Sequence, residues 1–303
     1  MESCNCYQGE KKLKLKNTLF LFCILIWIII AVFALVLVSL AAPVTQGENH
    51  DVVSVFTTIA PLEWFINSIA GDTAAISILV PAGVDAHVYE PKPEQMAELS
   101  KAEIYFAIGN FSPFEASSLP KIAEQTPSLM IVRLNEEIEE WHGDDPHIWT
   151  SVFSAPAILK NVRKAFVAVN PQNADMYNKN YIHALEKIKE LDAHIKDKYQ
   201  DSGGKSFIVY HPVWGRFAME YGINQIAIEH EGKEPKINAL ARLIETAREK
   251  EIKTIFAAPS DPKRNYLILA DQIGADVVML DPLASDWLQN MYSVTEEIYK
   301  ALR

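Results

Sequence analysis

Residues 172–199 read QNADMYNKNYIHALEKIKELDAHIKDKY, and this stretch decides how the rest of the chain is organised. Its apolar residues recur at three- and four-residue steps: Tyr177, Tyr181, Leu185, Ile188, Leu191, Ile195 and Tyr199. Pro171 precedes the stretch and Gly203-Gly204 follows it, which are typical helix-flanking residues. The pattern predicts one amphipathic helix of about 42 Å, at about 1.5 Å of rise per residue.

Short apolar runs alternate with helical patterns on both sides of this helix. Four runs precede it (52–57, 75–80, 103–108 and 129–133) and four follow it (206–210, 225–228, 254–257 and 276–280). Several are too uniformly apolar for a sheet with one wet face, which favours parallel strands covered on both faces. We therefore expect an α/β protein of two lobes, each with a mostly parallel sheet flanked by helices, joined by one long rigid helix. The alternative is an ordinary long surface helix within a single domain.

The segment 19–42, LFLFCILIWIIIAVFALVLVSLAA, contains no charged residue. Its 24 residues would span about 36 Å as a helix, enough to cross a bilayer with some tilt. Four lysines lie just before it, so the positive-inside rule places the stub in the cytoplasm and the body outside. An uncleaved N-terminal transmembrane helix, which anchors the body at the cell membrane, is favoured. Ser39-Leu40-Ala41 leaves open a cleaved signal with a secreted or periplasmic body.

These features divide the chain into four expected segments. Residues 1–43 form the Lys-rich stub with the anchor or signal segment, 51–171 the N-terminal α/β lobe, 172–199 the linking helix, and 200–303 the C-terminal α/β lobe.

Charge and cysteine content exclude several kinds of chemistry. The formal net charge is −11, and because residues 1–43 hold four lysines against two glutamates, the remainder carries −13. A body this acidic would repel phosphate, so no nucleic acid is expected as a partner. The three cysteines all lie within the first 23 residues. Any metal in the body must therefore be bound by His, Asp, Glu or backbone oxygen.

Four potential metal ligands lie in loops after predicted strands. His87 follows 75–80 in PAGVDAHVYEP, His147 lies in HGDDPHIWTS, His211 directly follows 206–210, and Asp281 directly follows 276–280. Ligands of open parallel sheets gather at the carboxyl ends of strands, so these side chains are expected to meet between the lobes. Three imidazoles and one carboxylate suit Zn²⁺ well. Asp85, Glu90, Asp145 and Tyr210 are candidates to orient the ligands or shield the site.

Five segments of the body resemble a known family. They are PAGVDAHVYEPKPEQMAELSKAEIYFAIG, DPHIWTS, FIVYHPVWGRFAMEYGI, EGKEPKINALARLIETAREKEIKTIFAAP and VVMLDPL. In this order, and over roughly residues 52–303, they resemble the zinc/manganese solute-binding proteins of ABC transporters, the ZnuA/TroA-like family. The resemblance implies two α/β lobes joined by a long helix with the metal between them. It places the family's ligands at His87, His147, His211 and Asp281.

The resemblance also implies a function. It indicates an extracytoplasmic receptor that binds Zn²⁺ and delivers it to a membrane permease driven by a cytoplasmic ATPase, without catalysing a reaction. His211 in its YHPVWG context resembles zinc-type members, whereas manganese-type members tend to carry a carboxylate at that position. A receptor for Mn²⁺ or Fe²⁺ is the first alternative.

Two further alternatives come from other classes. A membrane-anchored zinc hydrolase would use Glu90 or Glu229 as its base, but the chain contains neither HExxH nor Gly-x-Ser-x-Gly. The other is an adhesin or interaction protein with a structural metal, as a secondary role.

Overall fold

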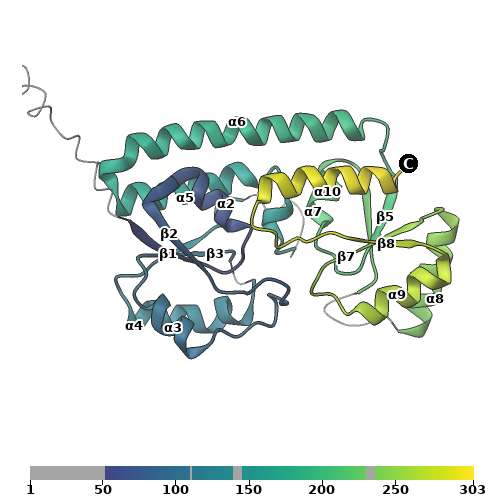
Figure 1. The fold of residues 1–303 in the computed structure, drawn as a ribbon, viewed down its shortest axis with the longest axis horizontal. Helices are drawn as coiled ribbons and strands as arrows, with labels where there is room; N and C mark the ends of the chain where they lie inside the picture. The colour runs from purple at the N-terminus through teal and green to yellow at the C-terminus, as the bar shows by residue number, and fades with distance from the viewer. Residues whose placement is uncertain (1–51, 110, 139–144, 230–235) are drawn as a thin grey trace, which may run out of the picture. The chain divides into compact units, whose positions relative to one another are not determined.

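The computed structural model describes residues 52–109, 111–138, 145–229 and 236–303, which form two four-stranded parallel sheets (Figure 1). The first sheet consists of β1 (Val53–Thr57), β2 (Ala74–Ile78), β3 (Ile104–Ala107) and β4 (Met130–Arg133). The second consists of β5 (Ser206–Val209), β6 (Asn224–Ala227), β7 (Thr254–Ala257) and β8 (Asp276–Met279). Each sheet with its helices is called here the first or the second lobe. The prediction of two α/β lobes, each built on a parallel sheet, is confirmed.

Both sheets have the same strand order. The first runs β2-β1-β3-β4 and the second β6-β5-β7-β8, with every pairing parallel. In each lobe the second strand lies on one side of the first strand and the third lies on the other. This reversal creates a crevice beyond the carboxyl ends of the two central strands, where ligands of open α/β sheets bind.

Helices cover both faces of each sheet. They are α2 (Leu62–Ala70), α3 (Pro93–Leu99), α4 (Leu119–Gln125), α5 (Ala155–Val169), α6 (Ala174–Tyr199), α7 (Gly215–Glu220), α8 (Ile237–Glu249), α9 (Lys263–Ile273) and α10 (Trp287–Ala301). In Figure 1, α3 and α4 lie on one face of the first sheet and α2 and α5 on the other, while α8 and α9 lie on the outer face of the second sheet. This two-sided cover explains why the central strands read as continuous apolar runs, because both of their faces are buried.

The long helix α6 has 26 residues and runs along both lobes (Figure 1). It begins two residues later than predicted because Pro171–Asn173 form a separate 3₁₀ turn. Its buried side chains are Tyr177, Ala184, Ile188, Leu191, Ile195 and Tyr199, and it packs against α5, α2 and α10. Burying each large apolar side chain contributes about 1.5–3 kcal/mol, so α6 is held along its length by a continuous apolar face.

The last helix returns to the first lobe. Trp287, at the start of α10, packs its ring 4.7 Å from that of Phe65 and 4.9 Å from that of Trp64, both on α2. Residues of α2, α5, α6 and α10 thus share one hydrophobic core that spans both lobes.

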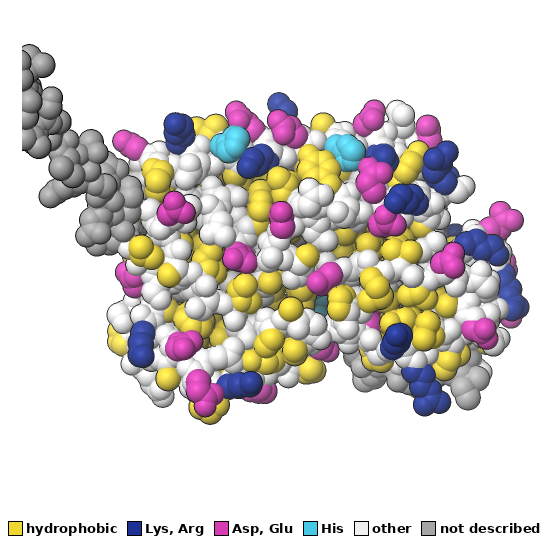
Figure 2. All heavy atoms as spheres, viewed as in Figure 1, with side chains coloured by type: hydrophobic (Ala, Val, Ile, Leu, Met, Phe, Trp, Pro, Cys, Tyr) yellow, Lys and Arg dark blue, Asp and Glu magenta, His cyan; other side chains and the backbone are white. Residues whose placement is uncertain are grey.

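The predicted N-terminal transmembrane segment, residues 19–42, lies outside the described residues. In the part of the chain that the structure does describe, no helix combines the length and apolarity needed to cross a bilayer. Charged side chains of both signs are interspersed over the face of the molecule drawn in Figure 2.

Candidate metal centre

A cavity of about 720 Å³ lies between the two lobes. Its walls come from the segments that follow strands β2 to β8, so it occupies the crevice that the strand order creates. The walls are mostly apolar and aromatic, and the polar groups among them include three histidines and the carboxylates of Asp85, Glu229 and Asp261. A concave, apolar site with a few convergent polar groups is the usual form of a binding site.

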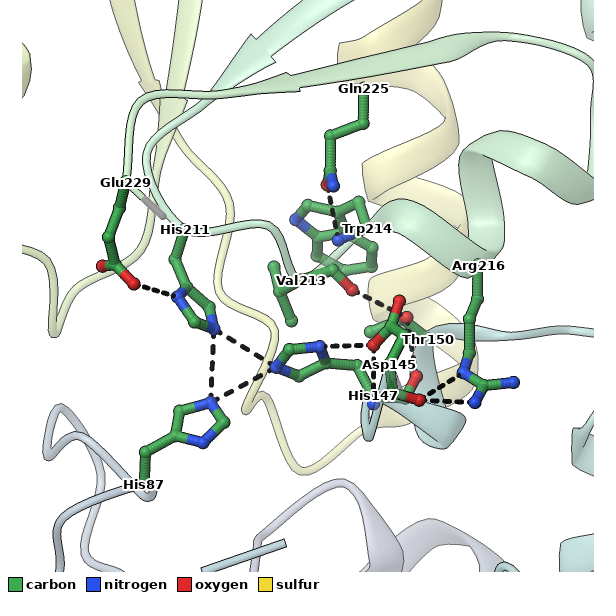
Figure 3. A network of polar contacts seen from close by, with 10 residues as sticks. All are labelled: His87, Asp145, His147, Thr150, His211, Val213, Trp214, Arg216, Gln225 and Glu229. Carbon is green, nitrogen blue, oxygen red and sulfur yellow. Dashed lines mark hydrogen bonds and ion pairs between the residues drawn. The ribbon is translucent and has the colours of Figure 1, made fainter. Parts of the chain in front are cut away.

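His87, His147 and His211 meet in this cavity with their Nε2 atoms in a triangle (Figure 3). The Nε2–Nε2 distances are 3.2 Å between His87 and His211, 3.3 Å between His87 and His147, and 3.2 Å between His147 and His211. His87 lies in the loop after β2 and His147 in the segment after β4, while His211 is the second residue after β5. The sequence predicted all three from their positions after strands.

Hydrogen bonds among the rings do not explain this triangle. A neutral imidazole carries one N–H and one lone pair, so three Nε2 atoms cannot satisfy three mutual contacts at once. A tetrahedral zinc ion, with Zn–N distances of about 2.0–2.1 Å, requires nitrogens that are about 3.3–3.4 Å apart. The observed spacing is close to this requirement, so the three Nε2 atoms could hold one ion together.

Two carboxylates bind the opposite nitrogens of these rings. Asp145 Oδ1 lies 2.7 Å from His147 Nδ1 and also accepts the backbone N–H of His147 at 2.9 Å. Glu229 Oε1 lies 3.2 Å from His211 Nδ1. When Nδ1–H donates a hydrogen bond to a carboxylate, the lone pair of Nε2 is left for a metal and the ring is fixed in orientation. Both contacts lie on the far sides of the rings from the nitrogen triangle (Figure 3).

The environment favours the neutral form of two of these rings, His87 and His147. Burial, followed by the neighbouring His147 and His211, lowers the pKa of His87 from 6.5 to about 4. Burial also lowers the pKa of His147, although Asp145 opposes that shift. For Asp145 itself, burial would raise the pKa, but the hydrogen bond and charge of His147 prevail and lower it. Neutral imidazole is the form that binds metal, so both shifts favour metal binding by His87 and His147.

Phe111 forms an apolar wall beside the histidines. Its ring lies 4.5 Å from that of His87 and 5.2 Å from that of Trp149. Buried Glu115 holds the loop that carries Phe111, because its carboxylate accepts the backbone N–H groups of Ile108 and Phe111 at 2.9 and 3.3 Å. Neither residue is predicted from the sequence, because the burial of Glu115 and its hydrogen bonds to the loop backbone appear only in the structure.

The other predicted site residues have different positions. Asp281 is not part of the histidine group, and its Oδ1 accepts the backbone N–H of Leu283 at 2.8 Å. Asp85 lines the cavity and accepts the backbone N–H of His87, and Tyr210 lines it too, with its hydroxyl 3.1 Å from Asn265 Nδ2. Glu90 is exposed and is not among the residues that line the cavity.

The sequence suggests Glu229 only as the base of a hydrolase, whereas in the structure it contacts His211. Its position just past β6, at the same edge as the other strand ends, was the signal for the role seen here.

Two α/β lobes, each with a parallel sheet, that face each other across a histidine-lined cavity define a class, the two-lobed solute-binding proteins. A family model described as ZnuA, zinc-uptake complex component A, periplasmic, matches residues 55–301. The chain belongs to this ZnuA family.

Known proteins are similar over most of this chain. The high-affinity zinc uptake system protein ZnuA of Bacillus subtilis is 27% identical over 79% of this chain and 81% of its own length. A crystal structure of ZnuA shares 33% identity with a TM-score of 0.78, covering 84% of this chain and 100% of that one. A ZnuA deletion mutant solved with zinc bound shares 35% identity with a TM-score of 0.77, over 83% and 98% of the two chains. The chain spans only 56% of the length of a similar streptococcal protein, the zinc-binding protein AdcA of Streptococcus pyogenes.

Proposed function

We propose that this protein is an extracytoplasmic receptor that binds Zn²⁺ with high affinity and delivers it to the permease of an ABC transporter, which a cytoplasmic ATPase drives. The ion is cargo, and the protein catalyses no reaction. The observation that carries the proposal is the triangle of Nε2 atoms at 3.2–3.3 Å, which suits one tetrahedral ion. Membership of the ZnuA family and the zinc named in its relatives support it.

The proposal assigns His87, His147 and His211 as ligands. Asp281 stays the predicted carboxylate ligand, and its contribution is testable separately because it lies outside the histidine group. Three nitrogen ligands favour zinc over manganese on affinity grounds, so Mn²⁺ or Fe²⁺ as cargo is the second candidate. A hydrolase would need a base beside the metal, and Glu229 is instead bonded to the Nδ1 atom of a ligand.

The proposal also covers placement in the cell. The body would lie outside the cytoplasm, where its cavity is open to ions and close to the permease. A helix over residues 19–42 would hold it to the membrane. We further propose residues 51–171 and 200–303 as the two lobes and 172–199 as the link between them. Cleavage after the apolar segment would give a periplasmic or secreted body with the same site.

Metal competition on the purified full chain tests the function. After the metal is stripped, stoichiometry and affinity are measured for Zn²⁺, Mn²⁺ and Fe²⁺. We expect one tight zinc ion per chain, lost in His211→Ala and retained in His183→Ala, which alters an exposed histidine on α6. Preference for manganese, or zinc binding that does not depend on His211, would overturn the zinc assignment. Hydrolysis of an ester or a peptide by the purified protein would instead favour the hydrolase as its function.

A further inference from the structure

The segment that carries His147 forms hydrogen bonds with the second lobe. By chain order, residues 145–153 connect β4 to α5 and belong to the first lobe. Yet Trp149 Nε1 donates to the carbonyl of Pro282 at 2.8 Å, and Thr150 Oγ1 donates to the carbonyl of Val213 at 2.9 Å. Trp287 Nε1 donates in turn to the carbonyl of Trp149 at 2.5 Å. These three partners lie after β8, after β5 and on α10.

The short helix α7 supplies the remaining bonds. At its end, the carboxylate of Glu220 accepts the hydroxyl of Ser151 and the backbone N–H of Val152, the latter at 2.9 Å. At its start, Arg216 Nε donates to the carbonyl of Asp145 at 3.0 Å, and Arg216 Nη2 donates to the same oxygen. Thus residues at both ends of α7 form hydrogen bonds with the segment that carries His147.

Arg216 is the less ordinary of the two residues. Its side chain is buried, with the residue only 6% exposed, and its Nη1 has no hydrogen-bond partner among the described residues. Burying an incompletely bonded cation is costly. The two bonds it does make converge on Asp145, the residue whose carboxylate holds His147 Nδ1 (Figure 3).

Gly215 shows how closely α7 approaches Asp145. A Cβ atom at Gly215 would lie 3.0 Å from Asp145 Oδ2, so an added methyl group would require the carboxylate to shift by a few tenths of an ångström. The contact between α7 and Asp145 therefore depends on both a glycine and an arginine at adjacent positions.

From these contacts we infer that Arg216 is a positioning residue for the metal site: acting through Asp145, it fixes His147 to the second lobe, so that His147 and His211 form one preformed pair. His87 is then the only one of the three histidines held by the first lobe. Any motion between the lobes would separate His87 from the pair and leave the pair intact. The inference rests on the proposed function, since it concerns the same site.

The test measures zinc affinity of the full chain in Arg216→Lys, which keeps the charge but loses the two-nitrogen fork. Changes in residues that orient metal ligands typically cost roughly 10- to 100-fold in affinity, and we expect a loss in that range. Co²⁺ in place of zinc reports ligand geometry through its visible spectrum, which should change as well. The effect on affinity should persist in a His87→Ala background, because Arg216 acts on the other two histidines.

Arg163→Lys is the matched control. Arg163 also has an unpartnered buried nitrogen, and it donates to Asn178 Oδ1 at 2.6 Å, joining α5 to α6 within the first lobe. It should lower the melting temperature of the metal-free protein without changing zinc affinity or the Co²⁺ spectrum. Equal affinity losses in both variants, or an unchanged affinity in Arg216→Lys, would overturn the inference.

Gly215→Ala provides a second route if Arg216→Lys does not fold. Its added Cβ disturbs Asp145 from the same side, and we expect the same direction of change in affinity and spectrum. Failure of the wild-type chain to bind zinc would instead refute the proposed function, so the two outcomes are distinguishable.

Discussion

The two lobes have the same strand order but contribute differently to the metal site. The second lobe places His211 just past the end of β5, and its Val213 carbonyl and Arg216 side chain also hold the segment that carries His147. The first lobe supplies His87 from a loop whose next residue, Val88, is 70% exposed. The same strand order in the two lobes therefore does not hold their metal ligands equally rigidly. A side chain at a strand end inherits the rigidity of the sheet, whereas one in a longer loop depends on its local contacts.

The largest expected effect separates the two kinds of ligand. His147→Ala removes the most buried of the three site histidines, which is only 4% exposed, and should weaken zinc binding by more than about 100-fold, beyond the usual cost of changing an orienting residue. His87→Ala should cost less, because the pair of His147 and His211 remains. Titration of both variants against a zinc chelator measures the difference.

Equal losses in the two variants would contradict this comparison of the lobes, and a larger loss in His87→Ala would reverse it. Circular dichroism of the metal-free variants shows whether either substitution has unfolded the chain.

The contact of α10 with the first lobe gives the next prediction. Trp287→Phe removes the donor to the Trp149 carbonyl and leaves that buried oxygen unsatisfied, at a cost of about 1–3 kcal/mol in the free energy of unfolding. Trp64→Phe is the control, because it alters a ring of the same cluster that is only partly buried. Urea denaturation should show the larger loss for Trp287→Phe, and equal losses would mean that the bond between the lobes adds nothing.

A pH dependence distinguishes His87 from exposed histidines. Its pKa is about 4 in the folded protein against 6.5 for the unperturbed group, so the unfolded chain takes up the proton first. Stabilisation that is present above pH 6.5 should therefore decrease as the pH falls from 6.5 to about 4. The measurement is the melting temperature of the metal-free protein across this range, for wild type and His87→Gln. The variant should show a shallower decline.

His183→Gln, on the exposed side of α6, should follow the wild-type curve. Burial raises the pKa of Glu220 to about 7, which stabilises the folded state as the pH falls and so opposes the effect of His87. That contribution is common to all three proteins and cancels in the difference between their curves.

The smallest effect is expected at Asp281. Its carboxylate accepts the backbone N–H of Leu283 and lies outside the histidine group, so Asp281→Asn should weaken zinc binding less than any of the three histidine substitutions. The same chelator titration provides the comparison. A loss as large as that of His147→Ala would show that the carboxylate moves in to complete the coordination of the bound ion.

The sequence predicted much of this architecture because its signals are local. Apolar runs flanked by helix starts identified every strand of both sheets, and three- and four-residue steps identified α6. The three histidines were found because parallel strands bring their carboxyl ends to one crevice.

What escaped prediction depends on contacts between distant segments. The pairing of Arg216 with Asp145 joins residues that are 71 positions apart, and Glu220 contacts residues nearly as far away. No periodicity marks such partners, since they are selected by the packing of α7 rather than by the pattern along the chain. The N-terminal apolar segment, by contrast, is evident in the sequence but lies outside the described residues.

The return of α10 to the first lobe has a consequence for biosynthesis. Domains generally begin to fold from the N-terminus during synthesis. Here the apolar surface around Trp64 and Phe65 stays uncovered until Trp287 has been made, near the end of the chain. A nascent chain that stops at Tyr199 would hold two of the three histidines but lack the cover for its own core. Such an unfinished chain would expose apolar surface and be prone to aggregation until α10 is in place.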